Sequence, residues 1–338
     1  MKRSAASSAN KRIRVLFAAG VLLFGAAVVT GLCLGSTRIG LPALLLALRQ
    51  GTQSAEGRIL LYVRLPRTAG CLLTGAALSV AGALIQNVFA NRLASPSIIG
   101  VNAGAGLAVT LCAAVGIYGG WKLSAAAFLG AFLAVLLVSL GARKWGASRG
   151  TVILMGVALN SLFNACADAV TTFLPDAGVM SGDFHVGDFS SVTVQKLVPA
   201  AAVILGVLAV LLTLTNELDV LTLGDDNARG LGLDTRAMRM AFLLLAALLS
   251  GCAVSLAGLL SFVGLLVPHA VRRLGAAGSR HLLPLCALFG AGFVTLCDTV
   301  ARTAFSPYEI PVGIIMAFLG APFFVFILIR GKGGPARA

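Results

Sequence analysis

Residues 216–239, NELDVLTLGDDNARGLGLDTRAMR, are the longest polar interruption in the apolar second half of the chain. They carry five acids and three arginines within 24 residues, and apolar stretches of helical length flank them on both sides. The hydrocarbon of a bilayer cannot hold eight charges, so this segment must lie in water. It therefore predicts that the chain crosses a membrane on each side of it.

The apolar residues of this segment recur at helical spacing around an acidic turn. They are Leu218, Leu221 and Leu223 before the turn, and Ala228, Leu231 and Leu233 after it. With Gly230 and Gly232 between the later ones, the pattern predicts two short amphipathic helices broken at glycine. Two interpretations remain open from the pattern alone: a docking element that takes force from a soluble partner, or a solvated loop.

The composition indicates an all-α, polytopic membrane protein. Hydrophobic residues make up 58% of the chain, charged residues 11%, and the mean hydropathy is +0.97, whereas a soluble domain carries about 25% charged residues. At about 20 residues per span, the length allows roughly nine to eleven helices. We expect ten, at residues 15–35, 65–89, 95–116, 121–142, 151–173, 195–215, 240–257, 259–275, 282–301 and 309–330. The third and eighth are rich in glycine or contain proline, so we expect them to be short or partly unwound.

These spans define one transmembrane domain, residues 15–330, between a basic N-terminus, 1–14, and a tail, 331–338. The first apolar stretch is too long for the apolar region of a signal peptide and is expected to be an uncleaved helix. With the N-terminus inside, 18 of the 26 Lys and Arg residues are cytoplasmic, as the positive-inside rule requires. Both termini and residues 216–239 are therefore expected in the cytoplasm.

Several arginines lie against this bias, at the outer ends of spans. Arg64 and Arg67 precede or begin the second span, and Arg302 ends the ninth. They could extend toward lipid phosphates or form a cationic surface for an acidic extracytoplasmic partner, and both alternatives stay open. Asp298 precedes Arg302 by four residues, so the two side chains can pair on one helix face.

The fifth span carries Asn160, Asn164 and Asp168 at intervals of four, which places them on one face. Such a row favours a transport pathway over hydrogen bonding between helices. His185 is expected in an outer loop, residues 174–194, without partners for a metal. No GxxxxGK[ST] motif, zinc or haem spacing or catalytic cluster occurs, and the seven cysteines are scattered singly, so an enzyme is not expected.

Five ordered blocks then resemble one family. They are RLPRTAGCLLTGAALSVAGALIQNVFANRLASPSIIGVNAGAG (64–106), LGDDNARGLGLDTRAMR (223–239), LAGLLSFVGLLVPHAVRRL (256–274), LCDTVART (296–303) and EIPVGIIMAFLGAPFFVFIL (309–328). Over nearly its whole length the chain resembles the FecCD-type permeases, the membrane subunits of ATP-binding-cassette (ABC) importers for ferric siderophores, haem and vitamin B12.

The resemblance implies a type II ABC importer permease fold in the cytoplasmic membrane of a bacterium. Its implied partners are a second permease, two cytoplasmic ATPases and an extracytoplasmic substrate-binding protein. ATP and Mg would bind the ATPases, and this chain would bind no cofactor or metal. The identity of the second permease and the choice among siderophore, haem and cobalamin stay open. The rival class is an ion-coupled secondary transporter in which Asp168 would be the coupling carboxylate.

The resemblance also implies roles for individual residues. Arg64, Arg67 and Arg302 would receive acidic groups of the binding protein, and Asn160, Asn164 and Asp168 would line the path. The structural ion pair of Asp298 with Arg302 is expected from their spacing instead. The cytoplasmic gate would comprise Asn91, Leu93 and Thr151, with Arg92 where the family has proline. The ATPase-coupling residues would be Leu223, Gly224, Asp225, Ala228, Arg229, Gly230, Leu231 and Gly232.

Overall fold

The computed structural model describes residues 2–35, 40, 42, 44, 46, 49, 51–144, 149–276 and 278–331, and within them every regular element is a helix. In chain order the elements are α1 (Lys2–Cys33), η1 (Gly51–Gln53), α3 (Ala55–Ile59), η2 (Leu60–Arg64), α4 (Leu65–Val88), η3 (Pro96–Ile99), α5 (Val101–Ala114), α6 (Gly120–Lys144), α7 (Arg149–Phe173), α8 (Pro175–Val186), α9 (Val194–Thr213), α10 (Thr215–Thr222), α11 (Asp225–Gly230), α12 (Thr235–Ala257), α13 (Val263–Arg273), α14 (Ser279–Thr303) and α15 (Val312–Gly331). The predicted tail lies outside the described residues, apart from Gly331.

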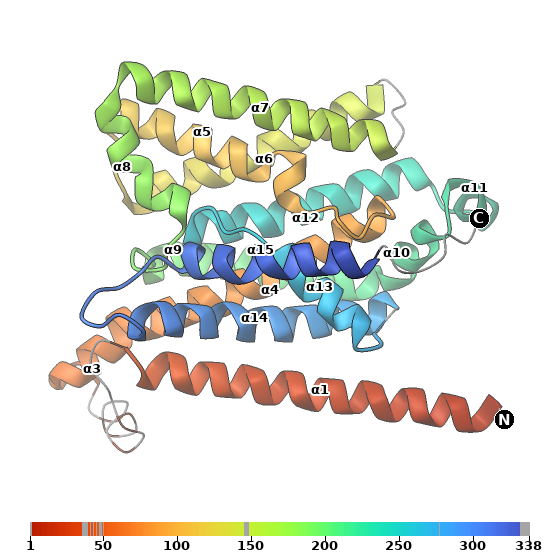
Figure 1. Cartoon of the computed structure of the whole chain (residues 1–338), viewed down its shortest axis with the longest axis horizontal. Helices are drawn as coiled ribbons and strands as arrows, with labels where there is room; N and C mark the ends of the chain where they lie inside the picture. The colour runs from red at the N-terminus through yellow and green to blue at the C-terminus, as the bar shows by residue number, and fades with distance from the viewer. Residues whose placement is uncertain are drawn as a thin grey trace.

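Each of the ten predicted spans coincides with a helix, and the long helices run side by side (Figure 1). Within the described residues, seven are long and apolar enough to cross a membrane, and α3, η2 and α4 together form one of them. The spans predicted to be short are α5, which the turn at Gly100 separates from η3, and α13, which has 11 residues. The predicted all-α membrane fold is therefore confirmed, with two interrupted spans.

The two ends of the bundle are built from different elements. The short helices α10 and α11 lie at the same end as the start of α1 and the end of α15 (Figure 1). The helix α3 lies at the opposite end, beside the loop that leads into α15. We call these the α10 end and the α3 end, and in the predicted orientation they are cytoplasmic and outer, respectively.

The central helix is α4, which packs against α14, α12 and α13 and is buried along most of its length. Small residues permit this packing, as in other membrane bundles. At Gly82, an added Cβ would lie 1.9 Å from the carbonyl oxygen of Gly264 on α13. Because the nearest atoms belong to the backbone, no side-chain rotation can make room there.

The segment after α7 corrects one expectation. Residues 174–194 are predicted to be a loop, but Pro175 opens the helix α8, since proline suits a first helical turn. His185 lies in its last turn, with Nε2 3.2 Å from the Thr110 hydroxyl of α5. Burial lowers the pKa of His185, although the charge of Asp168 opposes this shift, so the neutral imidazole is favoured for this hydrogen bond. The Phe184 carbonyl also accepts a hydrogen bond, at 2.9 Å, from the amide of Leu259 in the unwound segment before α13.

The close approach of α4 and α13 makes a testable prediction. Gly82→Ala should lower the free energy of unfolding by about 1–3 kcal/mol, because the two backbones must separate to admit the methyl group. Thermal unfolding of the purified chain in detergent measures this. Gly206→Ala in α9 is the matched control, because nothing lies within 4 Å of its added Cβ. Equal stability of the two variants would contradict the prediction.

Candidate functional site

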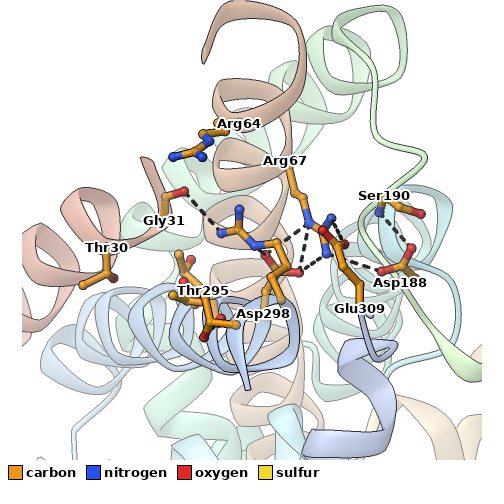
Figure 2. A network of polar contacts seen from close by, with 12 residues as sticks. Thr30, Gly31, Arg64, Arg67, Asp188, Ser190, Thr295, Asp298 and Glu309 are labelled. Carbon is orange, nitrogen blue, oxygen red and sulfur yellow. Dashed lines mark hydrogen bonds and ion pairs between the residues drawn. The ribbon is translucent and has the colours of Figure 1, made fainter. Parts of the chain in front are cut away.

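A cluster of buried ionised side chains lies at the α3 end, where α4 meets α14 (Figure 2). The carboxylate of Asp298, which is fully buried, pairs with Arg67 through Oδ1 (Nη2, 3.0 Å) and with Arg302 through Oδ2 (Nε, 3.0 Å). The pair between Asp298 and Arg302 is the one expected from their spacing. One carboxylate therefore serves two guanidinium groups, which leaves a positive charge to be balanced.

Two further carboxylates provide that balance. Glu309, in the loop before α15, accepts from Arg67 Nη1 at 2.7 Å, and Asp188, after α8, lies 3.7 Å from Arg67 Nη2. The side chain of Glu309 is 39% exposed, so the cluster meets solvent at this residue. Sequence reasoning missed Glu309 and Asp188. The signal was the excess of arginine at the outer ends of spans, which requires counterions.

The remaining guanidinium donors tie α1 to this cluster. Arg64 Nη1 donates to the carbonyl oxygens of Leu32 (2.7 Å) and Cys33 (2.9 Å), and Arg302 Nη2 donates to that of Gly31 (3.2 Å). These are carbonyls of the last turn of α1, which have no partner within their own helix and lie at the negative end of its dipole. The arginines therefore cap α1 from two neighbouring helices.

This geometry corrects the expectation of an exposed cationic surface. Arg64, Arg67 and Arg302 are only 3%, 5% and 3% exposed. Carboxylates and helix carbonyl oxygens of the same chain already interact with their guanidinium groups. Their role in docking a binding protein stays a prediction. Docking at Arg67 would have to compete with Glu309.

The polar row on α7 divides into two parts. Asn160 Nδ2 donates to the carbonyl oxygens of Ser97 (2.9 Å) and Ile98 (3.1 Å), so it serves the backbone of η3. Asn164 and Asp168 are exposed. Of the residues in the most apolar stretch of α7, only 17% are buried against the rest of the chain. The surface of α7 that carries Asn164 and Asp168 is thus open to a path or a partner subunit, whereas Asn160 has a structural use as well.

The predicted gate residues lie on two segments. Asn91 and Leu93 belong to the turn between α4 and η3, where Asn91 Oδ1 accepts from the Leu93 amide at 2.9 Å. Side chains of asparagine commonly close turns in this way. Thr151 is exposed in the first turn of α7. The turn forms with Arg92 in the position of the family proline, and a gating role for these residues stays a prediction.

The segment 216–239 contains two short helices, as predicted, α10 and α11, with a break at Gly224, whose φ is +99°. A positive φ favours glycine at this position. The second helix is shorter than expected, because α11 ends at Gly230, before Leu231 and Leu233, and residues 235–239 already belong to α12. Leu218, Leu221 and Ala228 are buried, while Leu223 and Leu231 are 56% and 67% exposed. The exposed pair gives this unit an apolar surface that faces away from the bundle.

Polar contacts join this unit to α12. Asp225 Oδ1 accepts from Arg239 Nη2 at 2.6 Å, and Arg229 Nε lies 3.3 Å from the Thr235 hydroxyl. Asp234 caps α12 by accepting from the amides of Arg236 and Ala237, each at 3.1 Å. The Asp225–Arg239 and Arg229–Thr235 contacts connect α11 with the first turns of α12, a long membrane helix.

The sequence profile of the FecCD transport family matches residues 22–330. The chain belongs to the FecCD transport family. This FecCD chain is 33% identical to the hemin transport system permease protein HmuU of Yersinia pestis over 334 residues, covering 96% of this chain and 98% of the relative. It is 36% identical to the vitamin B12 import system permease protein BtuC of Klebsiella pneumoniae over 313 residues, covering 88% and 93%.

A solved structure also resembles this FecCD chain. It is an ABC transporter assigned to the metal-chelate type, in an inward-facing conformation, with 30% sequence identity and a TM-score of 0.83. The similarity covers 94% of this chain and 99% of that one. The predicted family and its permease fold are therefore confirmed, and the chain is a multi-pass membrane permease.

The Asp298 cluster predicts a large loss of stability in one variant of this FecCD permease. Asp298→Asn keeps the side-chain shape but leaves two buried guanidinium groups without their shared anion, which should cost about 3–5 kcal/mol of unfolding free energy. Thermal unfolding in detergent is the measurement. Glu309→Gln, at a partly exposed site, should cost about 1 kcal/mol or less. The cluster would be unimportant if Asp298→Asn melted at the wild-type temperature.

Proposed function

We propose that this chain is the permease subunit of a bacterial ABC importer that carries an iron–siderophore, or a related metal chelate, across the cytoplasmic membrane. Membership of the FecCD transport family and the likeness to a metal-chelate type transporter support this substrate class. Haem and cobalamin are the alternative cargoes, since the two named relatives are described as hemin and vitamin B12 permeases.

The observation that carries the proposal is the unit formed by α10 and α11. It has an exposed apolar pair, Leu223 and Leu231, and it lies at the end of the bundle that we expect to be cytoplasmic. Exposed leucines at the ends of short helices suit insertion into a groove of a partner protein. The proposed partners are two ATPase subunits, which would bind ATP and Mg themselves.

ATP-driven movement would reach the membrane through both neighbours of this unit. The helix α10 follows α9 after one residue, and the Asp225–Arg239 pair attaches α11 to α12. Closure of the ATPases would tilt these long helices and switch the gate near Asn91, Leu93 and Thr151. ATP can shift the equilibrium only if the closed ATPases fit one permease conformation better than the other.

A second permease would cover the exposed surface of α7, and the path would run between the two copies along Asn164 and Asp168. At the α3 end, an extracytoplasmic binding protein would present carboxylates to Arg64, Arg67 and Arg302. Since Glu309 already occupies Arg67, a docking carboxylate would have to displace it or share the guanidinium. Docking would then alter the contacts that tie α15 to α4.

The coupling unit can be tested directly. Leu231→Glu should abolish co-purification with the cognate ATPase, because a charge on the exposed apolar surface cannot be desolvated in a groove. Ala237→Glu, at an exposed position in the first turn of α12, is the matched control and should retain the complex. Retention of the ATPase by both variants, with undiminished stimulation of ATP hydrolysis, would refute the coupling role.

Reconstitution tests the proposed function as a whole. Proteoliposomes containing this chain, its ATPase and its binding protein should accumulate labelled ferric siderophore when ATP is enclosed, because force enters through α10 and α11. Haem and cobalamin are tested in parallel to decide the cargo. Vesicles with the purified chain alone and a proton or sodium gradient are the control. Uptake in that control, without an ATPase, would establish the secondary-transporter alternative instead.

A further inference from the structure

A polar cavity of about 450 Å³ opens at the α10 end of the molecule, apart from the α3-end cluster and the exposed leucines. Three separate segments line it: α4 with the turn after it, α10, and the last turns of α13. The lining residues are Gln86, Asn87, Ala90, Arg92, Asp219, Thr222, His269, Arg272 and Arg273. Arg92, Thr222 and Arg273 are exposed, so a solute can enter from the water.

The charge of this cavity is positive. It contains three arginines, and Asp219 is the single acid among its described lining residues. Asp219 is already engaged, because its carboxylate accepts from the amide of Ser279 at 3.0 and 3.2 Å. Among the parts of the chain that the structure describes, Arg92 and Arg273 have no carboxylate partner. The cavity thus carries a net charge of about +2 with neutral His269.

Neutral contacts hold the third arginine in place. The guanidinium of Arg272 donates to Gln86 Oε1 and to Asn87 Oδ1, the latter at 2.6 Å, and Asn87 Nδ2 donates to the Ser279 hydroxyl at 3.1 Å. Amide oxygens orient this guanidinium without neutralising it. Its charge therefore remains available to a ligand in the cavity, with its position set before binding.

We propose that this cavity is a binding site for a phosphate-type oxyanion. A phosphate group carries up to two negative charges and several acceptor oxygens, which matches the guanidinium groups of Arg92 and Arg273 and the oriented Arg272. A single carboxylate, with one charge and two oxygens, would leave part of this charge and much of the volume unmatched. The phosphate can belong to a free anion or to the headgroup of an anionic lipid.

Such an anion would bridge two elements that line the cavity. Arg92 belongs to the turn that also carries Asn91 and Leu93, and Arg273 to the end of α13. Binding would hold this turn against the end of α13 by neutralising arginine charges that otherwise repel one another. The site lies within this chain, so its existence does not depend on the proposed importer partners.

The test is calorimetric titration of the purified full chain in detergent at constant ionic strength. Inorganic phosphate is one titrant, short-chain phosphatidylglycerol is the second, and chloride is the reference anion. Saturable heat with either phosphate compound, together with a raised melting temperature, is expected. A response to phosphate alone identifies a free anion, and a response to phosphatidylglycerol alone identifies a lipid headgroup. If neither phosphate compound gives more heat or a higher melting temperature than chloride does, the proposal is overturned.

Matched variants separate a built site from general attraction to a basic surface. The double variant R92Q/R273Q should weaken binding on the order of tenfold or more, because two charged donors are lost. The control R236Q/R280Q removes the same charge from exposed arginines that do not line the cavity, and its affinity should stay within about twofold of wild type. Equal weakening in both doubles overturns the assignment. Should R92Q/R273Q fail to fold, R273Q alone provides the milder case, with affinity reduced by about threefold.

Discussion

A guanidinium group can be buried in a membrane bundle only where a carboxylate and several carbonyl oxygens surround it. The α3 end of this permease is organised by that requirement. Asp298 pairs with arginines of α4 and α14, and the donors left over reach the last carbonyls of α1. Satisfying three guanidinium groups therefore positions three helices relative to one another, and Glu309 adds the loop before α15.

The α10 end is held together by different interactions. There the helices are short and one break falls at Gly224, while Leu218, Leu221 and Ala228 anchor α10 and α11 in the bundle and Leu223 and Leu231 face outward. The molecule thus combines an end whose charges pair within the chain with an end that leaves apolar side chains exposed. This contrast fits the proposed coupling of α10 and α11 to a separate subunit, because a partner can engage only the exposed side chains.

The sequence predicted the architecture well, because the hydrophobic effect and charge placement act locally along the chain. The spans, the water-exposed segment with its two helices, and the two interrupted spans all follow from composition and from glycine and proline. The helix α8 was missed because its residues are neither strongly apolar nor periodic, and its stability comes from contacts with α5 and the unwound segment before α13.

The sites were less predictable because burial depends on partners far away in the chain. The arginines of the α3 end were identified from their position, but their partners at Asp188, Glu309 and the end of α1 are set by tertiary structure. The short-range pair of Asp298 and Arg302 could be predicted, since four residues bring two side chains to one helix face. In the same way, the row on α7 was predictable as a row, while the use of Asn160 by η3 was not.

The hydrogen bonds from Asn160 to η3 restrict how α7 can move relative to η3. The carbonyl oxygens of Ser97 and Ile98 lie where the third span is interrupted, and both accept from one amide group of α7; the Ser97 oxygen also accepts from the Gly100 amide at a longer 3.4 Å. If α7 slid along its axis by a single turn, both oxygens would lose the donor that α7 supplies. We therefore expect α7 and η3 to move together as one rigid body when the transport path rearranges, because sliding between them is disfavoured.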